Sequence, residues 1–130
     1  MQLDRPVRVV VVDNDPDALE LAITDLRLEG HEIVGSGLDG DTALALCLAE
    51  RPDVAVIDHR MAPGPHGLEV AQRLGREAPE IQVIVFTNYQ DVELIDSVRA
   101  CGATYLPKGN LRALRQAVIT AARAPRAGLS

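Results

Sequence analysis

The chain has 130 residues, of which 47% are hydrophobic and 25% are charged. This length fits one domain with a substantial core, and the composition excludes disorder over most of the chain. The formal net charge is −6, and the only aromatic residues are Phe86, Tyr89 and Tyr105. We expect no direct nucleic-acid binding by this domain, because phosphate repels an acidic chain and no platform for base stacking exists.

Membrane and disulfide chemistry are also excluded at this stage. No apolar run approaches the roughly 20 residues needed to cross a bilayer, and no secretory signal follows Met1. Cys47 and Cys101 lie far apart without the spacing of metal ligands, which predicts two reduced thiols. We therefore expect a cytoplasmic protein without a membrane partner.

Short apolar runs alternate with amphipathic stretches along the whole chain. In chain order, the pattern predicts a strand over 7–12, a helix capped by Asp15 and ended by Gly30, a strand over 33–35, a helix over 41–51, a strand over 53–57, a helix over 67–77, a strand over 81–86, a helix over 91–101, a strand over 104–106 and a last helix capped by Asn110. Single helices between apolar strands require a parallel sheet that is covered on both faces. The predicted fold class is therefore α/β, a single-domain, doubly wound (βα)5 parallel sheet.

Four of these strands are followed by, or end in, residues that can carry chemistry. Asp13 follows the first strand, Asp58 the third, Thr87 the fourth and Lys108 the fifth. In such sheets, ligands bind beyond the carboxyl ends of the strands. Two carboxylates suit a Mg²⁺ ion, and an ammonium beside a hydroxyl suits a transferring phosphoryl group. This combination points to phosphoryl transfer.

The motifs around these positions resemble the receiver domain of two-component response regulators, over nearly the whole chain. They are VVVDNDPDAL, VAVIDHRM, VIVFTN and ATYLPK, in that order. The resemblance implies a receiver domain over residues 1–124 with the flavodoxin-like strand order 2-1-3-4-5. It leaves residues 125–130 as a disordered tail or as the start of a linker, to which a DNA-binding output domain could be joined.

The resemblance also implies the roles of individual residues. Asp58 would accept a phosphoryl group from the phosphohistidine of a sensor histidine kinase, in a signalling phosphorelay rather than an enzymatic turnover. Asp13, Asp58 and the backbone carbonyl of Arg60 would hold Mg²⁺. Thr87 and Tyr105 would form a switch that reshapes the surface of the fourth helix, fifth strand and fifth helix.

Among several departures from the family pattern, two bear on the metal and the loop beside it. Asn14 stands where receivers usually have a second acid that ligates the metal, so its uncharged amide should hold Mg²⁺ more weakly. The loop after Asp58 reads HRMAPGPHG and is one residue longer than usual. These departures motivate an alternative function, a receiver that acts as a binding module without phosphorylation.

A second alternative is a phosphatase of the haloacid dehalogenase type. Asp13 would be its nucleophile and Asp15 its general acid, with Lys108 as its lysine. Two features oppose this interpretation: no acid follows Asp96, although that family needs one, and Pro16 begins a helix where that family inserts extra elements. A flavodoxin-like cofactor site is opposed by the acids after the first strand, which repel phosphate.

Two further groups of residues allow a structural and a functional interpretation. His59 and His66 flank the acceptor, and we interpret them as solvated loop side chains rather than as a metal site or pH sensor. Acidic and basic residues on the fourth and fifth helices are interpreted as solvated, with a homodimer surface as the alternative. These residues are Asp91, Glu93, Asp96, Arg112 and Arg115.

Overall fold

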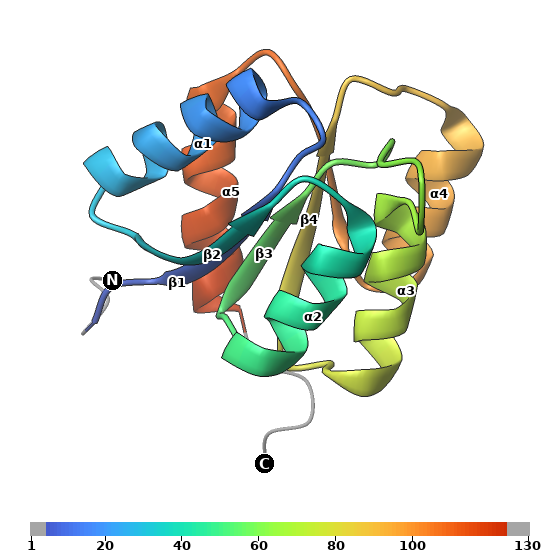
Figure 1. Cartoon of the computed structure of the whole chain (residues 1–130), viewed down its shortest axis with the longest axis horizontal. Helices are drawn as coiled ribbons and strands as arrows, with labels where there is room; N and C mark the ends of the chain where they lie inside the picture. The colour runs from blue at the N-terminus through green and yellow to red at the C-terminus, as the bar shows by residue number, and fades with distance from the viewer. Residues whose placement is uncertain (1–4, 125–130) are drawn as a thin grey trace.

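The structure, a computed structural model, describes residues 5–124 of the chain. Strands and helices alternate along it (Figure 1). The strands are β1 (Arg8–Val12), β2 (Glu32–Gly37), β3 (Val54–Ile57), β4 (Gln82–Thr87) and β5 (Thr104–Pro107). The helices are α1 (Pro16–Leu28), α2 (Gly40–Glu50), α3 (Gly67–Glu77), α4 (Val92–Ala100) and α5 (Leu111–Arg123).

The five strands form one parallel sheet in the order β2-β1-β3-β4-β5. This order confirms the predicted doubly wound fold. The central strand β3 is buried along its whole length, as its sequence VAVI predicts for a strand covered on both faces. The prediction of residues 125–130 as a tail lies outside the described residues.

The helices cover the sheet in two layers (Figure 1). Helices α1 and α5 pack on one face, where Leu26 and Leu114 meet Val9 of β1 in one apolar cluster. Helices α2, α3 and α4 pack on the other face, where Leu74 meets Val10 in a second cluster. Because side chains of a strand alternate between faces, β1 contributes to both clusters, and it is therefore anchored from both sides.

The predicted helix starts agree with the structure. The Asp15 side chain accepts a hydrogen bond from the N–H of Asp17, and Pro16 is the first residue of α1. The Asn110 side chain accepts one from the N–H of Ala113 at the start of α5. Both caps satisfy backbone donors that the first turn of a helix leaves free.

Strand β2 is longer than the sequence predicted, because the strand continues past Gly35 to Gly37. The prediction covered 33–35, whereas the strand spans Glu32–Gly37. A Cβ atom on Gly35 would lie 2.9 Å from the Leu46 side chain of α2, and one on Gly37 would collide with Thr42. These glycines let α2 approach the edge strand closely. The other strands differ from the prediction by only one residue at an end.

The interpretation of Arg115 as a solvated side chain is wrong. Arg115 of α5 is half-buried and pairs with two acids of α1, at 3.3 Å from Asp25 and 3.5 Å from Glu29. The two helices that share a face of the sheet are thus joined by charge as well as by apolar contacts.

The two cysteines are free, as predicted. Cys47 is buried in the core, and burial raises the pKa of its thiol to about 12, so the thiol stays protonated and unreactive. Cys101 is half-buried. Within residues 5–124, every helix is too short or too polar to cross a bilayer.

Helix α3 begins at a glycine that touches the backbone beside Asp58. A Cβ atom on Gly67 would collide with the carbonyl oxygen of Asp58, whereas one on Gly75, in the same helix, would lie 3.4 Å from its nearest neighbour. We predict that Gly67→Ala lowers the free energy of unfolding by about 1–3 kcal/mol through overpacking. Gly75→Ala is the matched control, and it should raise that free energy by up to about 1 kcal/mol because alanine favours a helix. Urea denaturation measures both, and equal effects would contradict the role given to Gly67.

Candidate functional site

The sheet brings the four predicted side chains to one edge. Asp13 and Asp58 follow the neighbouring strands β1 and β3, Thr87 ends β4, and Lys108 follows β5. Backbone hydrogen bonds continue the pairing of the strands past their ends. The N–H of Asp58 donates to the carbonyl of Val12 at 3.0 Å, and the N–H of Lys108 donates to the carbonyl of Thr87 at 3.0 Å. The positions of the site residues are therefore set by the sheet itself.

The Lys108 ammonium lies between the two carboxylates. Its Nζ is 2.5 Å from Oδ2 of Asp13 and 3.3 Å from Oδ2 of Asp58. All three side chains are largely buried, with 13% of Lys108, 7% of Asp13 and 10% of Asp58 exposed. The predicted convergence of these residues is confirmed, while their chemical roles stay predictions.

Each carboxylate has its second oxygen held by the backbone. Oδ1 of Asp13 accepts the N–H of Asp15 at 2.9 Å, and Oδ1 of Asp58 accepts the N–H of His59 at 2.7 Å. Both carboxylates are thus oriented with one oxygen toward the turn that follows the strand and the other toward Lys108. The site is preorganised before any ligand is bound.

Two carboxylates share one ammonium, and the pKa shifts of Asp13 and Lys108 reflect this imbalance. Burial raises the pKa of Asp13 above its ordinary value, and the charge of Asp58 raises it further. Hydrogen bonds from Lys108 and from the Asp15 backbone lower this pKa, but they do not outweigh the rise. Burial alone would lower the pKa of Lys108. The hydrogen bonds and charges of the two carboxylates outweigh it and raise that pKa, so Lys108 stays an ammonium at neutral pH. The site therefore retains an excess of negative charge that a cation would relieve.

Thr87 and Tyr105, the predicted switch residues, both bind the backbone of Tyr89. The buried hydroxyl of Thr87 accepts the N–H of Tyr89 at 3.1 Å. The hydroxyl of the half-buried Tyr105 donates to the carbonyl of Tyr89 at 3.0 Å. Sequence reasoning missed Tyr89, because only the folded β4–α4 loop brings its backbone to both residues.

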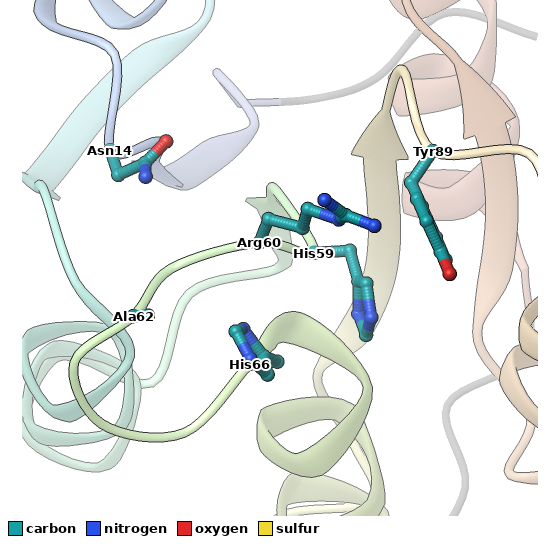
Figure 2. A pocket seen from close by; sticks show the side chains of 6 residues that line it. All are labelled: Asn14, His59, Arg60, Ala62, His66 and Tyr89. Atoms are coloured by element: carbon teal, nitrogen blue, oxygen red, sulfur yellow. The ribbon is translucent and has the colours of Figure 1, made fainter.

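Two adjoining cavities open beside the carboxylates. One of about 300 Å³ is lined by Asn14, Asp58, Arg60, Thr87, Asn88, Tyr89 and Lys108. The other, of about 430 Å³, is lined by Asn14, His59, Arg60, Ala62, His66 and Tyr89 (Figure 2). Asn14, Arg60 and Tyr89 line both cavities, so the two adjoin at these residues.

The interpretation of His59 and His66 as solvated side chains is wrong. Both are half-buried, and each accepts a backbone hydrogen bond at Nδ1, His59 from Leu68 at 3.3 Å and His66 from Met61 at 3.0 Å. Their ring centroids are 5.3 Å apart, and His59 stacks on Tyr89 at 5.7 Å. Burial lowers the pKa of His59, which favours the neutral ring that can accept this bond. The two rings fix the loop between Asp58 and α3.

The oxygen donors near the carboxylates fit a Mg²⁺ ion held by few protein ligands. Within the described residues, no group of three or more acidic, histidine or cysteine side chains is gathered as for a metal cage. Asp13 and Asp58 supply two carboxylates, and Asn14, exposed at the mouth, supplies an amide. Mg²⁺ is commonly bound by one or two carboxylates and keeps several waters, which matches this sparse set. Asp15 is used as the cap of α1.

Comparison with known proteins identifies a family. Residues 9–119 match the profile described as response regulator receiver domain. The chain is 39% identical over 105 residues to the probable transcriptional regulatory protein TcrX of Mycobacterium tuberculosis, covering 80% of this chain and 44% of that protein. It is 35% identical over 106 residues to the response regulator GacA of Pseudomonas aeruginosa, covering 79% of this chain and 49% of GacA. The chain thus spans less than half the length of these two relatives.

Solved structures agree with this match. The signal receiver domain of the putative response regulator NarL from Mycobacterium tuberculosis superposes with a TM-score of 0.87 at 31% identity, covering 93% of this chain and 99% of that one. A chain of the CheX–CheY–BeF3–Mg complex of Borrelia burgdorferi shares the fold, with a TM-score of 0.83 at 19% identity, covering 93% of this chain and 92% of that one.

Removal of the shared ammonium tests the charge balance of the site. We predict that Lys108→Met lowers the free energy of unfolding by about 3 kcal/mol at neutral pH, because two buried carboxylates lose their counter-charge. Adding Asp13→Asn should restore about 1 kcal/mol or more, since the repulsion between the carboxylates is then relieved. Urea denaturation of the two single variants and the double variant measures this coupling. Strictly additive effects would show that the three groups do not act together.

Proposed function

Because the chain belongs to the response regulator receiver family, we propose that it is a cytoplasmic phosphorelay domain in which Asp58 accepts a phosphoryl group from the phosphohistidine of a sensor histidine kinase. One observation carries the proposal: Lys108 lies between the buried carboxylates of Asp13 and Asp58, with the Thr87 hydroxyl lining the same cavity as Asp58. Nucleophile, cation and hydrogen-bond donor are thus present around one space.

Each of these groups has a defined task in the transfer. A carboxylate oxygen of Asp58 forms the new bond to phosphorus, while the phosphorus–nitrogen bond of the donor breaks and its electron pair stays on that nitrogen. The donor ring is already protonated at its other nitrogen, so it leaves as neutral imidazole. Lys108 neutralises charge on the phosphoryl oxygens. The hydroxyl of Thr87 exchanges its bond with the backbone of Tyr89 for one that it donates to a phosphoryl oxygen.

Magnesium would be held by Asp13, Asp58, the backbone carbonyl of Arg60 and the amide of Asn14. When bound, the ion supplies positive charge that offsets the two carboxylates and the incoming phosphoryl group. Asp13 is oriented for this task by the N–H of Asp15, and its remaining oxygen is shared with Lys108.

The response would reach the surface through Tyr89. If Thr87 turns to the phosphoryl group, the N–H of Tyr89 loses its partner. The loop that carries Tyr89, whose carbonyl accepts a hydrogen bond from the Tyr105 hydroxyl, is then released. Tyr105 can then reorient and reshape the surface of α4, β5 and α5. We propose this surface for protein partners, a homodimer among them, and no direct contact with nucleic acid or membrane.

Two alternatives have weaker support. A dehalogenase-type phosphatase would need Asp15 as its general acid, but the Asp15 side chain caps α1, and the family match is to receivers. A binding module without phosphorylation is motivated by Asn14 and by the altered loop after Asp58, whereas Asp13, Asp58, Thr87 and Lys108 keep the residue types that phosphoryl transfer requires.

Small phosphodonors test the acceptor directly. We predict that acetyl phosphate with Mg²⁺ adds one phosphoryl group to the chain, and that Asp58→Asn abolishes this mass gain. Asp41→Asn, an exposed acid of α2, is the control and should react like the wild type. A mass gain retained in Asp58→Asn would contradict the assignment, and no gain in any protein at high Mg²⁺ would support the binding module.

Asn14 should limit the affinity for the metal. We predict that Asn14→Asp binds Mg²⁺ on the order of tenfold more tightly, since a third carboxylate is added beside Asp13 and Asp58. Without Mg²⁺ the same variant should be less stable than the wild type, because a further negative charge enters an already acidic site. Titration calorimetry measures the affinity and urea denaturation the stability, each with and without Mg²⁺. An unchanged affinity would remove Asn14 from the metal site.

A further inference from the structure

The guanidinium of Arg60 lies over a neutral ring rather than beside an acid. Its Cζ is 4.1 Å from the centroid of the Tyr89 ring, which also stacks on His59. Figure 2 shows the Arg60 side chain extending from the loop after β3 toward Tyr89. Within residues 5–124, Arg60 forms no ion pair.

Arg60 is close to a site in which two carboxylates share a single ammonium. Arg60 and Tyr89 line the same cavity as Asp58, Thr87 and Lys108. Lys108 is already shared between two carboxylates, so its single charge does not fully neutralise a phosphoryl group of roughly −1.5 to −2 charge. Arg60 is exposed, and its long side chain is free to reorient between the ring and the cavity.

Besides its stack on His59, Tyr89 is held at three points in this arrangement. Its ring is covered by Arg60, its N–H is bound by Thr87, and its carbonyl is bound by Tyr105. Any event that removes Arg60 and Thr87 from Tyr89 therefore loosens the residue to which Tyr105 is attached. The ring contact adds a side-chain restraint to the two backbone restraints.

We propose that Arg60 and Tyr89 form a latch that holds the unphosphorylated conformation, and that the latch opens when Arg60 moves to the phosphoryl group on Asp58. The inference rests on the proposed function, and it adds to it a second phosphate-binding cation and a restraint on the switch.

Charge explains the direction of the movement. A phosphoryl group brings roughly −1.5 to −2 charge and three acceptor oxygens. An arginine binds such a group through paired, charge-assisted hydrogen bonds, which are stronger than its contact with a ring face. In the unphosphorylated site the competing anion is weaker, because both carboxylates already share Lys108 and accept backbone N–H groups. The ring is then the better partner.

The composition of the chain provides a direct readout. Tyr89 and Tyr105 are its only tyrosines, and it has no tryptophan. In protein labelled with ¹³C-tyrosine, the two sets of ring signals are therefore distinguished by a single variant, Tyr89→Phe. Beryllofluoride with Mg²⁺ serves as the mimic of the phosphoryl group, and the Thr87 amide signal reports on its binding.

We expect Arg60→Gln to shift the Tyr89 ring signals before any beryllofluoride is added. In the wild type, beryllofluoride should shift these signals in the same direction, and in Arg60→Gln it should shift them little further. Arg76→Gln, an exposed arginine in the last turn of α3, is the control and should behave like the wild type. Tyr89→Leu should bind beryllofluoride about two- to fivefold more tightly than Tyr89→Phe, which keeps the ring.

The outcomes separate the latch from the proposed function. If beryllofluoride shifts the Thr87 amide in the wild type but leaves the Tyr89 ring signals unchanged, the latch is refuted and the acceptor site stands. Equal affinities of Tyr89→Leu and Tyr89→Phe would also refute the latch. If neither signal responds at high Mg²⁺, the proposed function fails, and the latch fails with it.

Discussion

The contact of one ammonium with two buried carboxylates is the interaction on which the site depends. Asp13, Asp58 and Lys108 come from three strands of one sheet, and separately each would be a costly charge to bury. Together they still leave an excess of negative charge, which suits the cation binding and phosphoryl transfer that we propose. Stability and reactivity thus have the same electrostatic origin.

The charge asymmetry of the sequence is resolved by the fold. Acids are concentrated in the first half of the chain, and no acid follows Asp96. In the structure, bases of the second half pair with these acids: Lys108 contacts Asp13 and Asp58 at the carboxyl end of the sheet, and Arg115 pairs with two acids of α1 on the same face. The segments farthest apart in sequence are therefore held together by opposite charge as well as by the apolar core.

The proposed communication from the site to the surface would pass through Tyr89, which lines the cavity. Tyr89 joins the hydroxyls of Thr87 and Tyr105 through its backbone, and its ring contacts both Arg60 and His59. In the switch that we propose, a change of charge at Asp58 would be transmitted through these contacts, because they are few and arranged around one residue. The latch places the sensitive step in a contact between a cation and a ring, which is weak enough to be exchanged.

The sequence by itself determined the layers, the strand order through the family resemblance, the caps of α1 and α5, and the four polar positions at the strand ends. Each of these features depends on local periodicity or on a motif only a few residues long, and it was therefore predictable from the sequence. The tertiary structure alone decided the roles of Tyr89, His59, His66 and Arg115, because rings and charges from distant loops meet only after the sheet has formed. It also decided the length of β2, because Gly35 and Gly37 lie within the strand and leave room for side chains of α2.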